Sequence, residues 1–250
     1  MQLPFAGIER FIAVGVITRD RTWTCAKGIY GPATAEHALA LMLAAARRIP
    51  HYARLRRWTE LELGSPERRL AGATVIVFGA GGIGRPLMAM LQPLEASVIA
   101  VNRSGSPVPG AHRTVPASEL GEVIGEADWV AITAPLTAET RGLFSAGMLS
   151  KMRREACLVN VARGAIVDTD ALVHALATGG IAGAALDVTD PEPLPEGHPL
   201  WSLDNALITP HVANTWDMAL PELRGLVRRN VAHFAAGEPL EGVVDPETGY

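Results

Sequence analysis

The sequence predicts an α/β fold: a doubly wound parallel sheet with an incomplete second domain attached. From Ala73 onward, short apolar runs rich in β-branched residues alternate with amphipathic segments, a pattern typical of parallel strands joined by helices. The first of these runs, at 74–78, ends in a glycine-rich turn. Residues 1–32 hold apolar pieces broken by polar turns, so they do not resemble a complete domain.

The individual elements follow from hydrophobic periodicity and from residues suited to helix ends. Short apolar runs predict strands at 74–78, 97–102, 114–115, 129–133, 157–161, 182–188 and 206–209. Amphipathic or apolar stretches predict helices at 35–48, 85–92, 117–124, 140–152, 168–177 and 218–236, with a further helix in the arginine-rich passage before Ala71. Thr34 is expected to cap the first helix and Pro50 to stop it, while Asp168 or Thr169 begins the helix at 168–177 and Gly179–Gly180 ends it.

The turn after the first strand has the spacing Gly79-x-Gly81-x-x-Gly84. Gly79 can adopt backbone angles closed to other residues, Gly81 leaves no side chain between backbone and ligand, and Gly84 lets helix and strand approach. The N–H groups at the start of the next helix can hold a pyrophosphate. Glycine-rich turns also occur for steric reasons alone, but the second strand ends at Asn102, close to where a ribose-reading residue is expected. The turn therefore predicts dinucleotide binding.

Composition excludes several classes of protein. The chain of 250 residues is 48% hydrophobic and 19% charged, which is typical of a globular fold. Its formal charge of −4 argues against a nucleic-acid surface, and no stretch resembles a membrane span or a secretory leader. Cys25 and Cys157 match no metal or redox spacing. We therefore expect no metal site, and two free buried thiols in a reducing cytoplasm.

Three polar residues fall where strands of the predicted sheet end: Arg163, Glu192 and His211. In an open parallel sheet, ligands bind beyond the carboxyl ends of the strands. A guanidinium, a carboxylate and an imidazole at that edge suit reduction of a carbonyl group next to a carboxylate. Each residue has a structural alternative, because an arginine can cap carbonyl groups, a loop acid can be merely solvated, and a lone histidine is more often structural. Their common placement favours catalysis.

Three segments of the chain resemble a known family. They are 158–168 (LVNVARGAIVD), 186–195 (LDVTDPEPLP) and 208–212 (ITPHV), and segments 135–140 and 237–245 match it as well. By these segments the chain resembles the D-isomer-specific 2-hydroxyacid dehydrogenases, which include glyoxylate/hydroxypyruvate reductases and phosphoglycerate dehydrogenases. The resemblance implies a Rossmann-like cofactor domain and a flavodoxin-like substrate domain. It also implies an oxidoreductase that moves a hydride between a nicotinamide cofactor and a small 2-oxoacid or D-2-hydroxyacid.

The resemblance implies roles for individual residues. Arg163 would bind the carboxylate and carbonyl of the substrate, and His211 would exchange a proton with the carbonyl oxygen. Glu192 would fix the tautomer of the imidazole and stabilise its protonated form. Backbone N–H groups of Ala6 and Gly7 would hold the substrate carboxylate.

A further set of residues is implied to contact the cofactor, with Asp187 at the carboxamide of the nicotinamide. The set is Thr34, Gly79, Gly81, Gly82, Ile83, Gly84, Asn102, Arg103, Ser104, Ala134, Pro135, Thr140, Val161, Ala162 and Asp187. Members that prefer NAD carry an acid at the end of the second strand, where this chain has Asn102 and then Arg103. Without that carboxylate a 2′-phosphate is not repelled, and Arg103 can pair with it. We therefore expect NADP or NAD as the cofactor, with NADP favoured.

The chain departs from the family pattern at its start, because family members begin with a further segment that builds most of the substrate domain. We therefore expect residues 1–32 to be a remnant of the substrate domain, 33–212 to be the dinucleotide-binding domain, and 213–250 to return to the substrate domain. The family's habit of pairing through the cofactor domain predicts a homodimer. The missing segment leaves an alternative open, a dinucleotide-binding module or redox sensor with impaired catalysis. A formate dehydrogenase is a third alternative, which the residues around His211 disfavour.

Overall fold

The computed structural model describes residues 1–8, 11–12, 14–58, 60 and 67–246. The chain divides into two compact units, one of residues 34–213 and one of residues 1–33 together with 214–250. Each unit has its own hydrophobic core. Among the described residues, no helix is long and apolar enough to cross a membrane.

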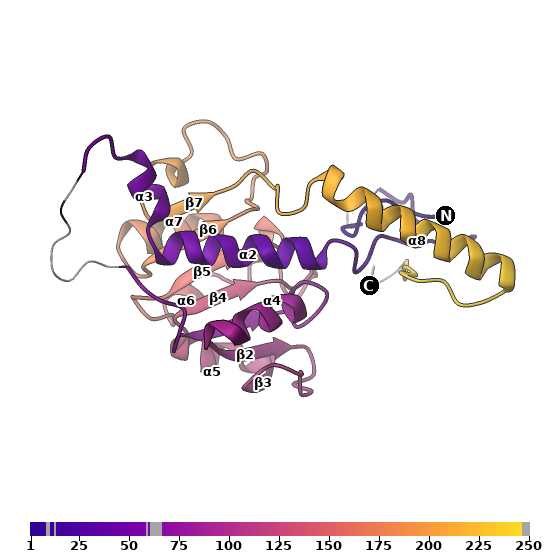
Figure 1. The fold of residues 1–250 in the computed structure, drawn as a ribbon, viewed down its shortest axis with the longest axis horizontal. Coiled ribbons are helices and arrows are strands. Elements are labelled where there is room, and N and C mark those ends of the chain that lie inside the picture. Colours follow the sequence, from indigo (N-terminus) through magenta and orange to yellow (C-terminus); the bar gives the residue numbers. More distant parts are fainter. Residues whose placement is uncertain (9–10, 13, 59, 61–66, 247–250) are drawn as a thin grey trace. The chain divides into compact units, whose positions relative to one another are not determined.

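The unit of residues 34–213 is built on a seven-stranded sheet in the order β3-β2-β1-β4-β5-β6-β7 (Figure 1). All neighbouring strands are parallel. The strands are β1 (Thr74–Phe78), β2 (Ser97–Asn102), β3 (Arg113–Pro116), β4 (Trp129–Ile132), β5 (Cys157–Asn160), β6 (Gly183–Leu186) and β7 (Ala206–Ile208). The strand order reverses between β1 and β4, which creates the switch point where such sheets bind ligands. The predicted doubly wound parallel sheet is confirmed.

Helices cover both faces of this sheet (Figure 1). One face packs against α2 (Gly31–Ala46) and α4 (Gly84–Leu91), and the other against α5 (Leu120–Val123), α6 (Ala146–Leu149) and α7 (Thr169–Ala177). Val75 and Val77 of β1 belong to the first layer, whereas Ile76 and Phe78 belong to the second. This division arises because successive side chains of a strand point to opposite faces. The remaining elements of the unit are α3 (Ile49–Arg54), η1 (Gln92–Leu94), η2 (Ala117–Glu119), η3 (Ile124–Glu126), η4 (Gly164–Ile166) and η5 (Pro199–Ser202).

The helix predicted at 140–152 is wrong, since only α6 forms there. The Thr140 hydroxyl donates to the carbonyl oxygen of Pro135 at 2.8 Å, and Gly142 has a φ of 62°. The N–H of Phe144 donates to the carbonyl oxygen of Ile166 at 3.1 Å instead of to its own turn. Side-chain and long-range bonds thus compete successfully with the helix.

The first helix begins earlier than predicted. It starts at Gly31, so Thr34 lies in its first turn and is not the cap. Pro32 explains the earlier start, because the fixed φ of proline suits the first turn of a helix. The helix ends at Ala46, and Pro50 lies in the first turn of α3. Pro50 therefore helps to start the next helix, and α3 confirms the helix predicted before Ala71.

The caps predicted for the helix at 168–177 are confirmed. Asp168 accepts a hydrogen bond from the N–H of Ala171 at 3.0 Å, and Gly179 has a φ of 67° after the helix end. The last helix, α8 (Trp216–Ala236), likewise ends at a glycine in the left-handed region, Gly237.

The unit of residues 1–33 and 214–250 joins the two ends of the chain. Thr24 forms a parallel bridge with Gln2 and an antiparallel bridge with Val243. Asn230 of α8 donates to Gln2 at 2.9 Å and exchanges two hydrogen bonds with the backbone of Glu241. The segments that precede and follow the sheet unit in the sequence therefore fold together as one unit.

Both cysteines are free and buried, as predicted. Burial raises the pKa of the Cys25 thiol, and it also raises that of Cys157 although the charge of Arg68 acts against it. The two thiols are therefore held in their protonated form.

Candidate active site

The glycine turn joins β1 to α4 at the switch point of the sheet. Gly79 has a φ of 107°, and a Cβ there would lie 2.4 Å from the backbone nitrogen of Ala134. A Cβ on Gly84 would lie 2.2 Å from the carbonyl oxygen of Gly79, whereas one on Gly81 would meet nothing within 4 Å. The steric expectations for Gly79 and Gly84 are confirmed, and the role of Gly81 toward a ligand stays a prediction. Gly82 is exposed and Ile83 is half-buried in the same turn.

The end of β2 is organised by the side chain of Asn102. Its Oδ1 accepts from the N–H groups of Ser104 at 3.1 Å and Gly105 at 2.6 Å, and its Nδ2 donates to the carbonyl oxygen of Ser106 at 2.8 Å. Such bonds are typical of an Asx-turn. The amide of Asn102 thus shapes the loop that presents Arg103 and Ser104.

The loop after β4 carries Ala134, which is buried, and Pro135, which is exposed. Thr140 closes this loop by its bond to Pro135. Glu139 lies beside it, and its pKa is lowered mainly by a hydrogen bond from the Thr137 hydroxyl, with the charge of Arg103 contributing. The loops after β2 and β4 are therefore close enough to interact electrostatically.

Arg163 follows β5 and is fixed by a neighbour that sequence reasoning missed. Asn160, whose side chain is buried, accepts from the N–H of Ala162 at 3.0 Å and donates to the carbonyl oxygen of Arg163 at 2.9 Å. Arg163 itself donates from Nη1 to the carbonyl oxygen of Ala162 at 2.7 Å. An asparagine in the otherwise apolar run at 157–161 was the available signal. Val161 and Ala162 are buried at this edge.

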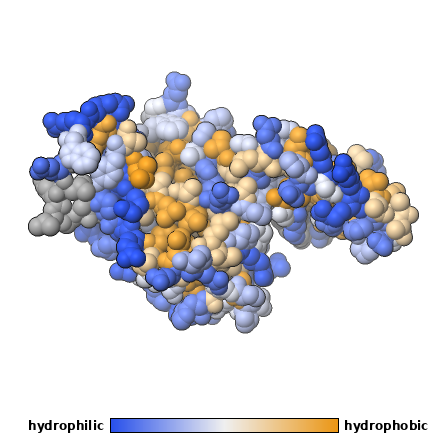
Figure 2. Space-filling model, in the orientation of Figure 1, coloured by the Kyte–Doolittle hydropathy of each residue, from blue (hydrophilic) through white to orange (hydrophobic). Residues whose placement is uncertain are grey.

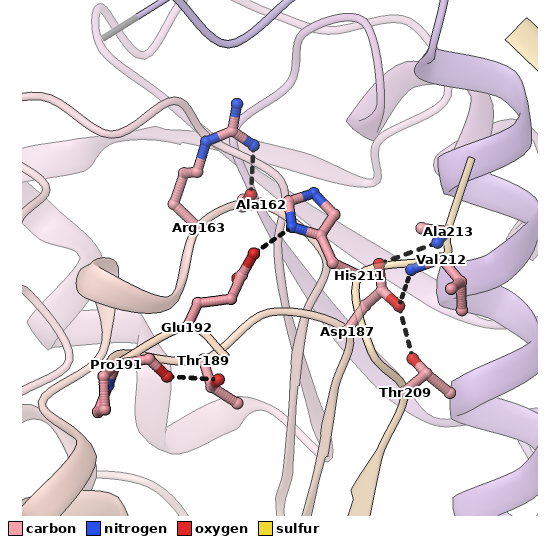
Figure 3. A network of polar contacts seen from close by, with 10 residues as sticks. All are labelled: Ala162, Arg163, Asp187, Thr189, Pro191, Glu192, Thr209, His211, Val212 and Ala213. Carbon is pink, nitrogen blue, oxygen red and sulfur yellow. Dashed lines mark hydrogen bonds and ion pairs between the residues drawn. The ribbon is translucent and has the colours of Figure 1, made fainter. Parts of the chain in front are cut away.

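His211 and Glu192 meet directly, as Figure 3 shows. The Nδ1 atom of His211 lies 2.6 Å from Oε1 of Glu192, and the imidazole side chain is 49% exposed, so a ligand can reach it. Glu192 comes from the loop after β6 and His211 from the turn after β7. With Arg163 after β5, the three predicted catalytic residues follow three neighbouring parallel strands.

Asp187 holds the backbone of the turn that carries His211 (Figure 3). Its Oδ1 accepts from the Thr209 hydroxyl at 2.6 Å and from the N–H of Val212 at 3.0 Å, and its Oδ2 accepts from the N–H of Ala213 at 3.0 Å. The N–H of His211 donates to the carbonyl oxygen of Asp187 at 2.8 Å. This carboxylate therefore fixes the turn, a task that sequence reasoning did not assign to it.

The remaining predicted residues fall in different parts of the chain. Thr34 is buried near the start of α2, within the unit that contains the sheet. Ala6 and Gly7 are half-buried and belong to the other unit. Their roles stay predictions.

Comparison with known proteins gives the family. The family model described as "D-isomer specific 2-hydroxyacid dehydrogenase, NAD binding domain" matches residues 39–213. A protein of Corynebacterium melassecola, named only as an uncharacterised protein in the proB 3′ region, is 42% identical over 252 residues, which cover 100% of this chain and 83% of that protein. The glyoxylate reductase of Thermofilum pendens is 35% identical over 232 residues, 88% of this chain and 67% of that enzyme.

A solved structure from the same family has a fold similar to that of this chain. The crystal structure of a D-isomer-specific 2-hydroxyacid dehydrogenase from Xanthobacter autotrophicus, in complex with NADPH and MES, matches with a TM-score of 0.86 at 32% identity. The match covers 100% of this chain and 78% of that one. With a family model over residues 39–213 and this agreement in fold, the chain belongs to the D-isomer-specific 2-hydroxyacid dehydrogenase family.

Proposed function

We propose that this chain is a 2-oxoacid reductase that favours NADP and interconverts a small 2-oxoacid and its D-2-hydroxyacid. The observation that carries the proposal is the contact of 2.6 Å between His211 and Glu192, with Arg163 following the next strand of the sheet. An imidazole held by a carboxylate can give and take a proton, and a guanidinium binds a carboxylate by a planar fork. The glyoxylate reductase of Thermofilum pendens supports a small 2-oxoacid as substrate.

The geometry of the pair supports a separate role for each nitrogen of the His211 ring. Nδ1 of His211 faces Glu192, so the N–H at Nδ1 donates a hydrogen bond to that carboxylate. Nε2 is then left to exchange a proton with the substrate. During reduction Nε2–H gives its proton to the carbonyl oxygen, while Glu192 stabilises the positive charge that the ring carries beforehand. Arg163 binds the substrate carboxylate and so fixes which face of the carbonyl is presented. When bound, the nicotinamide supplies the hydride for C2 of the substrate.

The residues at the switch point fit a dinucleotide. Gly81 leaves open space where a pyrophosphate would approach the backbone, and N–H groups at the start of α4 would hold it. Asp187 would hold the carboxamide in addition to its role in the turn. Asn102 cannot act as the acid that reads a ribose, and Arg103 beside it suits a 2′-phosphate.

A rate assay tests the proposal. The purified chain is given NADPH or NADH with glyoxylate, hydroxypyruvate, pyruvate or phenylpyruvate, and oxidation of the cofactor is followed. Turnover of at least one 2-oxoacid is expected, and a His211→Ala variant should lose orders of magnitude in kcat while it keeps its affinity for the cofactor. Cofactor binding without turnover of any 2-oxoacid would contradict the proposal and favour a redox-sensing module.

Cofactor preference has its own test. Arg103→Ala should weaken NADPH by roughly 10- to 100-fold, the value of a charge-assisted hydrogen bond, and leave NADH nearly unchanged. Glu139→Gln serves as a matched control, because it removes the charge that interacts with Arg103 without removing the guanidinium. Equal weakening of both cofactors by Arg103→Ala would contradict the choice of NADP.

The proposal also covers the substrate domain and the oligomeric state. Residues 1–32 and 213–250 would contribute to a substrate domain, with Ala6 and Gly7 binding the substrate carboxylate, and the enzyme would work as a cytoplasmic homodimer. Figure 2 shows hydrophobic surface over α2, where Leu43 is 40% exposed, which supports pairing through the sheet unit. Sedimentation of the chain and of a Leu43→Glu variant tests this, since the variant should be the smaller species.

A further inference from the structure

Helix α2 brings a second histidine to the turn that carries His211. Nε2 of His37 lies 3.0 Å from Oγ1 of Thr209 and 3.3 Å from Oδ1 of Asp187. The His37 side chain is 22% exposed, and that of Asp187 is 1% exposed. His37 and Thr209 are 172 residues apart in the sequence, and no motif singled out His37. The contact therefore depends on how α2 packs on the sheet.

Simple chemistry fixes where the protons lie in this group. The Thr209 hydroxyl is 2.6 Å from Oδ1 of Asp187, and an ionised carboxylate can only accept. The single hydroxyl proton is thus used toward Asp187, which leaves the lone pairs of Oγ1 facing His37. His37 must then carry a proton on Nε2. The three groups form a directed chain from His37 through Thr209 to Asp187.

The carboxylate at the end of this chain controls the backbone around His211. Asp187 accepts from the N–H groups of Val212 and Ala213, while its carbonyl oxygen accepts from the N–H of His211. His211 has a φ of 54°, in the left-handed region that is unfavourable for a residue other than glycine. This turn needs fixed hydrogen bonds to persist, and Asp187 supplies them.

We propose that His37 is a positioning residue for His211, acting through Thr209 and Asp187. Its N–H keeps the Thr209 hydroxyl directed at the carboxylate and adds a donor beside a buried negative charge. Without the imidazole the hydroxyl can rotate, and the turn that aims His211 at Glu192 loosens. His37 contacts none of the reacting groups itself. This inference deepens the proposed hydride transfer and rests on it for its effect on rate.

Three variants test the inference by rate. His37→Leu removes the donor at similar volume, and His37→Gln keeps an N–H at similar reach. The exposed neighbour in Glu36→Gln is the matched control on the same helix. His37→Leu should lower kcat by roughly 10- to 100-fold, as a small misplacement of a catalytic group does, with the Kd for NADPH unchanged. His37→Gln should restore most of the rate, and Glu36→Gln should match the unmodified chain.

A double-mutant cycle shows whether the effect passes through Thr209. In a Thr209→Val background, adding His37→Leu should lower kcat by clearly less than it does in the unmodified chain, because only the contact of 3.3 Å with Asp187 is then left to lose. Additive losses would overturn the inference, as would equal losses in His37→Leu and His37→Gln.

Two measurements without turnover separate this inference from the proposed function. Nitrogen NMR of the ring should show Nε2 of His37 protonated, and amide exchange at Val212 and Ala213 should speed up in His37→Leu but not in Glu36→Gln. If the unmodified chain reduces no 2-oxoacid, the proposed function fails while these measurements still decide the contact. Unchanged exchange in His37→Leu, or an unprotonated Nε2, would overturn the role of His37 even in an active enzyme.

Discussion

Adding one methyl group at Gly79, Gly81 or Gly84 of the switch-point turn should produce three different results. In Gly84→Ala the new Cβ would lie 2.2 Å from the carbonyl oxygen of Gly79, and in Gly79→Ala it would lie 2.4 Å from the nitrogen of Ala134. Both obstacles are backbone atoms, so we expect Gly84→Ala to cost about 3 kcal/mol, near the upper end for overpacking. Gly79→Ala adds the strain of a φ of 107°, which brings its cost to about 3–5 kcal/mol.

Gly81→Ala should behave in the opposite way. Its Cβ meets nothing within 4 Å, so the free energy of unfolding should change by less than about 0.5 kcal/mol. The methyl group would stand between the backbone and the pyrophosphate, so the Kd for NADPH should rise by tenfold or more. Urea unfolding without cofactor measures the first quantity, and a fluorescence titration with NADPH measures the second.

Gly72→Ala is a suitable control, because Gly72 has a φ of 77° but open space around its Cβ position. It should show the cost of the backbone conformation alone, about 1–2 kcal/mol. If Gly84→Ala proves as stable as Gly81→Ala, the close approach of α4 to β1 is wrong. If Gly81→Ala keeps its affinity for NADPH, the dinucleotide does not bind at this turn.

Further predictions concern the loops, the catalytic pair and the thiols. Asn102→Asp keeps the acceptor that orders the loop after β2 but adds a charge, so the ratio of kcat/KM for NADH to that for NADPH should rise by more than tenfold. Glu192→Gln should lower kcat by roughly 10- to 100-fold, because the amide stabilises the protonated ring less well, and leave the Kd of the cofactor unchanged. Asp187→Asn places an amide against a buried backbone N–H, so urea unfolding should show a loss of about 1–3 kcal/mol. Because burial raises the pKa of both thiols, Cys25 and Cys157 carry less thiolate at neutral pH, and labelling should be slow until the chain unfolds and should speed up as pH rises.

Much of the fold was predictable because each strand of the sheet is a separate apolar run in the sequence. All seven strands were expected within a few residues of their observed bounds. The runs of β1, β2, β4, β5 and β6 are buried along most of their length, which makes them continuously apolar. The contact between His211 and Glu192 was also foreseeable, because residues that follow neighbouring parallel strands emerge at one edge. Local pattern and topology suffice for such features.

The misses have a common physical origin in contacts between distant parts of the chain. The helix expected at 140–152 did not form because the N–H of Phe144 bonds to the distant carbonyl oxygen of Ile166, which no local pattern reveals. The bonds of Asn160 to the backbone around Arg163, and that of Thr209 to Asp187, depend on side-chain geometry within the folded sheet. His37 is reached only through the packing of α2, so periodicity could mark its helix but not its partner.

The position of β7 at the edge of the sheet has a consequence for the stability of the site to heat. This strand has three half-buried residues and forms the last strand of the sheet, and among the described strands it pairs with β6 alone. An end strand so short frays at a lower cost in free energy than the strands inside. Fraying there carries His211 away from Glu192 while the sheet remains intact. The chemistry of this protein should therefore be more sensitive to heat than the fold, with inactivation preceding any change in circular dichroism.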